Sequence, residues 1–325
     1  MESIDRWRAL VLYGRNVATY KIALGSVLLD FAQKGEAIVD FPDLAAAFID
    51  VYTTRLESAR PQMNVLGRTT LMEKVVAAMR VGALTRNQAI EIVSRDGFND
   101  VVPRFHTLPG GVLDASFYRT ESYRIELDDS ILDLVRSTSL SELRDELESR
   151  WSLLETAFSK SFNPAALNLD KDVIYYTQLF ERTAVTSARP VITGYQNGLC
   201  FYCSEPLEIE PVETHVDHVI PRAAIASDEI WNLVVAHATC NLRKSDNIPP
   251  REYIEALYLR NEYYIASNHP IKQHLIWATG KGSRERRQFL ENTYSRATMS
   301  IARFWRPPKI VTLRDPLSSL RIIEH

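Results

Sequence analysis

The segment CFYCSEPLEIEPVETHVDHVIPRAAIASDEIWNLVVAHATCN, residues 200–241, contains all three cysteines of the chain and three of its seven histidines. Its two ends have the same form: two residues separate Cys200 from Cys203, and two separate His237 from Cys240. Sulfur and imidazole nitrogen are ligands that Zn²⁺ prefers, and a structural zinc site arranges four such ligands in a tetrahedron. We therefore expect a structural zinc site that joins the two ends of the segment.

Two other interpretations of the cysteines stay open at this point. A redox dithiol would need a strand before CFYC and a helix after it, whereas the flanking YQNG and SEP are typical of turns. Two unrelated buried thiols are the other alternative, because free cysteine is often buried. A disulfide framework is disfavoured by the odd number of cysteines.

The residues between and just after the two pairs suit a different chemistry. Asp217 and Asn241 carry side-chain oxygens, which Mg²⁺ or Mn²⁺ prefers as ligands. His218 can act as a general base, since the unperturbed pKa of histidine is near neutrality. Neighbours on a regular strand point to opposite faces. We therefore expect the strand to end or bulge at Asp217 and His218, and we expect Asn241 near the start of a short helix.

This segment resembles the HNH nucleases, which have the ββα-metal fold. The family pattern is Asp-His before two apolar residues and a proline, then Asn-Leu, then Cys-Asn followed by a lysine. The matching residues are Asp217, His218, Pro221, Asn232, Leu233, Cys240, Asn241 and Lys244. His237 departs from the pattern because that zinc ligand is usually a cysteine. The resemblance covers about residues 195–250.

The resemblance implies a role for each matching polar residue. His218 would deprotonate a water molecule that attacks a phosphodiester phosphorus, while Asp217 and Asn241 would hold one divalent ion. Asn232 would keep His218 in place through hydrogen bonds across the loop. The products implied by the family end in a 5′ phosphate and a 3′ hydroxyl.

Several basic residues are expected to contact nucleic acid. Lys244 and Arg243 would meet a phosphate, as would Arg222, for which an ordinary surface charge is the alternative. Downstream, arginines are interleaved with aromatic residues over residues 280–309, where a helix can follow a phosphate backbone. A solvated helix face is the alternative for this stretch. Its basic residues include Arg284, Arg286, Arg287, Arg296, Arg303, Arg306 and Lys309.

The charge of the chain is unevenly distributed. Residues 1–240 carry 23 Lys and Arg against 33 Asp and Glu, whereas residues 241–325 carry 15 against 8. A basic final quarter favours a polyanionic partner, and double-stranded DNA is the partner we expect. A fluctuation of surface charge is the alternative.

The whole sequence predicts a mainly α protein with two domains. Apolar residues recur at helical spacing in most of residues 1–184, which we expect to form a helical N-terminal domain for regulation or for recognition of a partner or DNA. A helix is expected over residues 172–185, DVIYYTQLFERTAV. Residues 185–325 would form the zinc-stabilised ββα-metal HNH module with C-terminal helices. Thr85 is expected as a helix N-cap with Gln88 at the capping-box position, and His106 is expected at the surface.

The predicted function is a metal-dependent endonuclease that nicks one DNA strand per module. A zinc-stabilised nucleic-acid-binding protein without cleavage is one alternative, and an RNA- or structure-specific nuclease is another. A helical domain beside such a module suits an antiphage defence or restriction system, with other protein components as partners, and roles as a homing endonuclease or in DNA repair stay open as alternatives. No apolar run is long enough for a membrane span, and the N-terminus lacks a signal-peptide pattern. We therefore expect a cytoplasmic protein without a membrane partner or a small-molecule cofactor.

Overall fold

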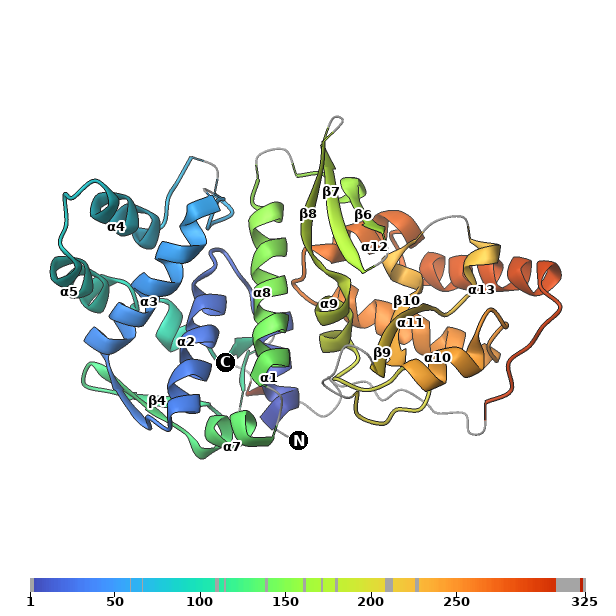
Figure 1. The fold of residues 1–325 in the computed structure, drawn as a ribbon, viewed down its shortest axis with the longest axis horizontal. Coiled ribbons are helices and arrows are strands. Elements are labelled where there is room, and N and C mark those ends of the chain that lie inside the picture. Colours follow the sequence, from blue (N-terminus) through green and yellow to red (C-terminus); the bar gives the residue numbers. More distant parts are fainter. Residues whose placement is uncertain are drawn as a thin grey trace. The chain divides into compact units, whose positions relative to one another are not determined.

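The computed structural model divides into two compact units, Met1–Phe162 with Ser319–His325, and Asn163–Ser318 (Figure 1). The described residues are 3–307 and 322–323, except 59, 66, 109–110, 114, 138–139, 160–161, 171, 179–180, 208–212 and 226–227. Within this described part, no helix combines the length and the apolar character that crossing a membrane requires.

The first unit is built mainly from helices. Ten of the fifteen residues of helix α2 (Tyr20–Lys34) are buried, with Ile22, Leu24 and Leu28 fully so, and this helix therefore lies largely inside the unit. The helices are α1 (Ser3–Tyr13), α2 (Tyr20–Lys34), α3 (Phe41–Arg55), α4 (Leu71–Arg80), α5 (Arg86–Asp96), α6 (Val101–Arg104), α7 (Asp129–Ser137) and α8 (Leu140–Ala157). The capping box predicted at the start of α5 is confirmed, because Thr85 and Gln88 bond each other's backbone N–H groups.

Two small antiparallel sheets complete this unit. One has the strand order β1-β5-β4, formed by β1 (Ile38–Asp40), β5 (Arg124–Leu127) and β4 (Tyr118–Glu121). The other has the order β11-β3-β2, formed by β11 (Ile322–Ile323), β3 (Gly111–Leu113) and β2 (Thr107–Leu108). A segment from the C-terminal end of the chain therefore pairs with a strand of the first unit.

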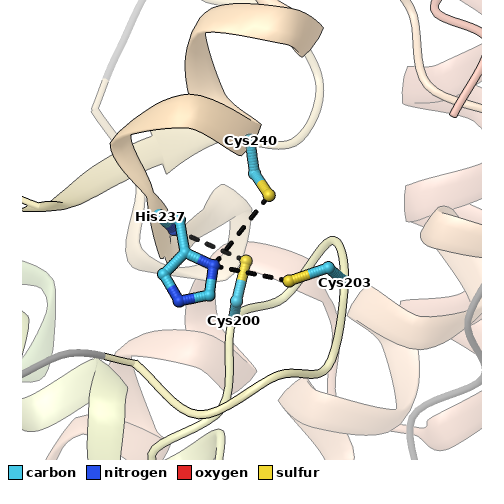
Figure 2. A group of neighbouring side chains, drawn as sticks. All are labelled: Cys200, Cys203, His237 and Cys240. Atoms are coloured by element: carbon cyan, nitrogen blue, oxygen red, sulfur yellow. Dashed lines mark hydrogen bonds between the residues drawn. The ribbon is translucent and has the colours of Figure 1, made fainter. Parts of the chain in front are cut away.

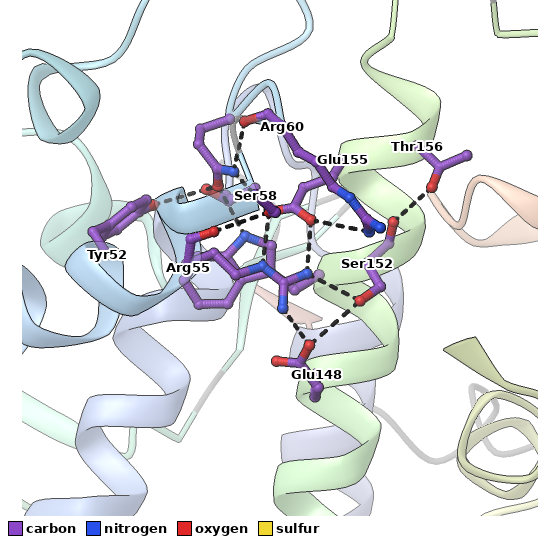
Figure 3. A network of polar contacts seen from close by, with 11 residues as sticks. Tyr52, Arg55, Ser58, Arg60, Glu148, Ser152, Glu155 and Thr156 are labelled. Carbon is purple, nitrogen blue, oxygen red and sulfur yellow. Dashed lines mark hydrogen bonds and ion pairs between the residues drawn. The ribbon is translucent and has the colours of Figure 1, made fainter. Parts of the chain in front are cut away.

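A buried ion pair ties α3 to α8 (Figure 3). Arg55 donates to both carboxylate oxygens of Glu155 at 2.7 Å, and the Glu155 side chain is only 1% exposed. Gln62 adds a third donor at 2.7 Å and itself accepts from the indole of Trp151. A buried carboxylate costs stability unless it is paired and hydrogen-bonded, and here several donors meet that need.

His106 lies inside this unit, which corrects the expectation that it is a surface residue. It is 8% exposed, and its Nε2 accepts a hydrogen bond from the backbone N–H of Phe117 at 2.9 Å. Burial, with the nearby charge of Lys21 as a smaller cause, lowers the pKa of His106 to about 4. The side chain is therefore neutral at physiological pH and part of the core.

The second unit begins with a three-stranded antiparallel sheet in the order β6-β7-β8. Its strands are β6 (Leu167–Asp170), β7 (Val173–Gln178) and β8 (Glu181–Ser187), so the helix expected over residues 172–185 is wrong. The reason is visible in VIYYTQ: Ile174 and Tyr176 are buried and their neighbours are not, which is the period of a strand. The division of the chain falls after Phe162 and not near residue 185, because this sheet belongs to the second unit.

The remainder of the second unit contains a strand-strand-helix arrangement surrounded by helices (Figure 1). Strand β9 (Thr214–His218) pairs antiparallel with β10 (Leu233–His237), and α10 (Ala238–Lys244) follows β10 directly. The other elements are α9 (Ala188–Tyr195), the 3₁₀ turns η4 (Arg222–Ala224) and η5 (Ile230–Asn232), α11 (Arg251–Ala266), α12 (Ile271–Thr279) and α13 (Ser283–Ser300). This is the ββα arrangement that the sequence predicted for the module.

Candidate active site and metal centre

The two cysteine-containing pairs meet at one place (Figure 2). The ligand atoms of Cys200, Cys203, His237 and Cys240 all lie within 4.8 Å of one another. The Nδ1 atom of His237 is 3.4 Å from the sulfur of Cys203 and 4.0 Å from that of Cys240. In a tetrahedral site with zinc–sulfur bonds of roughly 2.3 Å, neighbouring ligand atoms are roughly 3.5 to 3.8 Å apart. The four residues therefore fit a tetrahedral metal ion such as Zn²⁺.

The orientation of the His237 ring supports the same conclusion. Its Nε2 lies 2.9 Å from the carbonyl oxygen of Pro206, to which only a protonated nitrogen can donate. The proton is therefore on Nε2, and Nδ1 presents its lone pair to the three sulfurs. Metal-binding histidines commonly have their second nitrogen held in this way.

The thiols need a cation if they are to be thiolates. Burial and the neighbouring sulfurs raise the pKa of Cys240 to about 12 when no metal is bound, and burial also raises the pKa of Cys203. A bound Zn²⁺ deprotonates its thiol ligands outright. Three thiols gathered around one imidazole nitrogen are thus arranged for a metal rather than for a free dithiol.

Asp217 lies at the end of β9, which stops at His218 as expected. Its Oδ2 accepts a hydrogen bond from the hydroxyl of Tyr202 at 2.5 Å and is 3.2 Å from the ammonium of Lys244. Within the described part of the chain, no protein partner is found for Oδ1. The side chain is 12% exposed, so one carboxylate oxygen is fixed by the protein and the other can bind a cation.

Lys244 is not placed as predicted. It is 1% exposed and donates to the backbone oxygens of His218 and Ser245, at 2.7 and 3.1 Å. Burial lowers its pKa, with the charge of Asp217 acting in the opposite direction. The ammonium is thus an internal partner of Asp217 and of the strand end, and it does not reach the surface where a phosphate would bind.

Asn241 lies on the fourth residue of α10, close to β9. Its Nδ2 donates to Nδ1 of His215 at 3.2 Å, and both residues are at the surface or partly exposed. His215 and Asp217 share one face of β9, because they are two residues apart on the strand. The hydrogen bond uses the nitrogen of the amide, which leaves its oxygen for a cation.

His218 forms a pair with a residue that the sequence analysis did not single out. Its Nε2 is 2.8 Å from Oδ1 of Asp228, whose side chain is only 10% exposed. Because a carboxylate accepts, Nε2 carries the proton and Nδ1 is the basic nitrogen. Nε of Arg222 lies 3.4 Å from the same Asp228 oxygen, and the Arg222 side chain is 67% exposed, so its contact with a phosphate stays a prediction.

Asn232 holds the loop that follows His218. It is fully buried, its Oδ1 accepts from the backbone N–H of Ile220 at 2.9 Å, and its Nδ2 donates to the carbonyl of Ile220 at 2.8 Å. The backbone of Asn232 adds a third bond, from the N–H of Val219 at 2.9 Å. This is the cross-loop bonding that the resemblance implied for this residue.

The predicted nucleic-acid contacts on α13 differ in whether their side chains are already paired with a carboxylate. Arg287 pairs with Glu255 and lies over the ring of Tyr258, and Arg286 forms a two-point pair with Glu262. Arg284 is exposed. Arg243 is exposed on α10, and Lys309 lies outside the described residues. Within the described part of the chain, the predicted cations that are exposed and have no carboxylate at ion-pair distance are Arg243, Arg284, Arg296, Arg303 and Arg306.

Tyr202 and Asp228 are the site residues that sequence reasoning missed. Tyr202 is one of the two residues between the cysteines of CFYC, but nothing in the spacing indicates that its hydroxyl reaches Asp217. Asp228 lies ten residues after His218 in a segment without regular structure. Only the folded loop brings that carboxylate to the imidazole.

Comparison with known proteins agrees with this geometry. Residues 200–250 match the family of HNH endonucleases, which confirms the resemblance for this segment. A stretch of 60 residues is 33% identical to a protein named CRISPR-associated endonuclease Cas9 from Listeria innocua serovar 6a. The similar stretch makes up 18% of this chain and only 4% of that protein. The similarity thus concerns an HNH endonuclease domain and not the remainder of either chain.

Proposed function

We propose that this protein is a metal-dependent endonuclease that hydrolyses phosphodiester bonds of DNA. The observation that carries the proposal is the pair formed by His218 and Asp228 beside Asp217 at the end of β9. A base oriented by a carboxylate, next to an acid with one free oxygen, serves hydrolysis and is not needed for binding alone. The match of residues 200–250 to HNH endonucleases supports the same reaction.

In this proposal each residue has a separate task. Nδ1 of His218 takes the proton of the attacking water, while Asp228 fixes the ring and stabilises the positive charge that the ring gains. Asp217 and Asn241 would hold Mg²⁺ or Mn²⁺. When bound, such an ion would supply positive charge that stabilises the transition state of phosphodiester hydrolysis.

Three buried side chains keep this arrangement in place. Lys244 orients the Asp217 carboxylate together with Tyr202, and Asn232 fixes the backbone after His218. Zn²⁺ at Cys200, Cys203, His237 and Cys240 would join the segment before β9 to the start of α10. A closed four-ligand site of this kind is structural rather than catalytic.

The experiment that tests the proposal compares metal ions and substrates. The full chain loaded with zinc is incubated with labelled single-stranded DNA, double-stranded DNA or RNA, with and without Mg²⁺ or Mn²⁺. Asp217→Asn and Asn241→Ala should abolish cleavage, whereas the control Asn168→Ala, an exposed position on β6, should cut like wild type. Cleavage confined to RNA would establish the RNA-specific alternative, and binding without any cleavage would establish the binding-module alternative.

We further propose that the first unit recognises a partner or restrains the nuclease, as in antiphage defence. The proposal draws on the separate fold of the first unit and on a difference in charge: residues 1–162 carry 19 Lys and Arg against 23 Asp and Glu, whereas residues 241–325 carry 15 against 8. Bacteria expressing wild type or His218→Ala are challenged with a panel of phages. Fewer plaques with wild type alone would support a defence role, and equal plaque numbers for every phage would contradict it.

A further inference from the structure

A cavity of about 630 Å³ in the second unit lies between the turns η4 and η5 and the helices α12 and α13. This volume is within the range of roughly 300 to 1,000 Å³ that is typical of pockets for small ligands. The catalytic residues described above are not part of its lining. The cavity therefore raises the question of what it accepts.

Three aromatic side chains define the character of the cavity. Trp231 is buried and meets the ring of Phe289 edge to face, with ring centroids 5.1 Å apart. Trp277, on α12, is 65% exposed although it lines the same cavity. Pockets for ligands are lined mainly by apolar and aromatic side chains with a few polar groups, and this lining has that composition.

The polar lining adds one cation. Arg296 is exposed, its Nη2 donates to Oγ1 of Thr293 at 3.3 Å, and among the described residues it has no carboxylate partner within ion-pair distance. Glu229, the acidic residue of the lining, is already engaged with Nε2 of His274 at 3.2 Å. A planar, electron-rich ligand with a negative charge nearby would satisfy both the aromatic rings and the guanidinium.

The cavity shares its wall with the loop that holds His218. Glu229 lines the cavity, and its neighbour Asp228 contacts the His218 ring. Trp231 lines the cavity, and its neighbour Asn232 holds the backbone after His218. Consecutive Cα atoms are only about 3.8 Å apart, so the cavity and the catalytic loop are adjacent.

We propose that this cavity binds an unpaired nucleobase of the nucleic-acid substrate, with the base stacked on Trp277 and an adjoining phosphate at Arg296. This inference rests on the proposed function, because the pocket would give the proposed nuclease site a preference for substrates with unpaired bases. Aromatic side chains and arginine are the groups that recognise bases freed from a duplex. An apolar protein side chain in the cavity would leave the charge of Arg296 without a partner.

The test measures binding and not cleavage, so that it can fail independently of the proposed function. The zinc-loaded full chain is titrated, without added Mg²⁺ or Mn²⁺, into labelled single-stranded DNA and into a strand of equal length made of abasic residues. The variants are Trp277→Ala and Arg296→Ala. Met299→Ala is the matched control, since Met299 is 86% exposed on α13 and does not line the cavity.

Wild type should prefer the strand that carries bases. Trp277→Ala should weaken binding of that strand by roughly 5-fold to 150-fold, the effect of losing one stacked base, and should leave binding of the abasic strand unchanged. Arg296→Ala should weaken binding of both strands, and Met299→Ala should change neither. Far-UV circular dichroism and zinc content verify that each variant is folded.

Two duplexes distinguish the sources of the unpaired base. If the protein binds a duplex with one bulged base more tightly than a fully paired duplex, and Trp277→Ala loses this difference, the base is one extruded from a helix. If binding depends on Trp277 only for single strands, the substrate is single-stranded. The proposal is overturned if Trp277→Ala binds the base-carrying strand as wild type does, or if wild type binds neither strand. If wild type cleaves DNA but Trp277→Ala binds as tightly as wild type, the proposed nuclease function stands and the base pocket is rejected.

Discussion

Replacing Asn232 by alanine should loosen the catalytic loop by an amount that the structure allows us to work out. The amide of Asn232 is the side-chain partner of both the N–H and the carbonyl of Ile220, and the residue is fully buried. Each buried backbone group that loses its partner costs about 1 to 3 kcal/mol, so the two together cost about 2 to 6 kcal/mol. The backbone bond from Val219 to the carbonyl of residue 232 survives the substitution and limits the damage to this loop.

Hydrogen exchange at Ile220 measures this cost locally, which matters because the chain has two units and need not unfold in one transition. A loss of about 2 kcal/mol speeds exchange of that amide about 30-fold. Cleavage should fall about 100-fold, because a displacement near 1 Å at a catalytic group has an effect of that size. Asn168→Ala removes exposed amide bonds and is the control. Unchanged exchange at Ile220, or unchanged cleavage by Asn232→Ala, would refute the reasoning.

Three further predictions follow from individual side chains. Asp228→Ala removes a charge-assisted hydrogen bond of about 1.5 to 3 kcal/mol, so cleavage should fall about 10-fold to 150-fold while DNA affinity is unchanged; equal rates would exclude a role in orienting His218. Cys240→Ala should reduce zinc to well below one equivalent in metal analysis and destabilise the second unit in thermal unfolding, and full zinc content would contradict the metal site. His106 has its pKa lowered to about 4, so the unfolded state binds more protons between about pH 4 and 6.5. Stability of the first unit should therefore rise over this range by up to about 3 kcal/mol, a slope that denaturant titrations of His106→Gln should lack.

Those parts of the site that depend on spacing alone could be predicted from the sequence. Two-residue spacing brings Cys200 next to Cys203 and His237 next to Cys240, and a tetrahedral ion then requires the two pairs to meet. The ending of β9 at His218 followed from the need to use two neighbouring side chains together.

The parts that depend on burial or on distant contacts could not be predicted in the same way. Lys244 stands where the resemblance gives a lysine, but a motif does not reveal that its ammonium turns inward to Asp217. Asp228 reaches His218 through a loop without a periodic pattern. Residues 172–185 have apolar side chains that suit either a helix or a strand. The structure has a strand there, in which the buried Ile174 and Tyr176 alternate with less buried neighbours. The proposed base pocket combines four elements, and no local pattern identifies such a combination.

Cleavage of supercoiled plasmid DNA by wild type and by His218→Ala is the most direct test of the central claim. Both zinc-loaded proteins are incubated with the plasmid in Mg²⁺ or Mn²⁺, and the circular and linear forms are separated on a gel. Our account predicts open circles with wild type and divalent ion, and intact supercoils with His218→Ala or without the ion. Equal cleavage by both proteins in the same ion would contradict the assignment of His218 as the base.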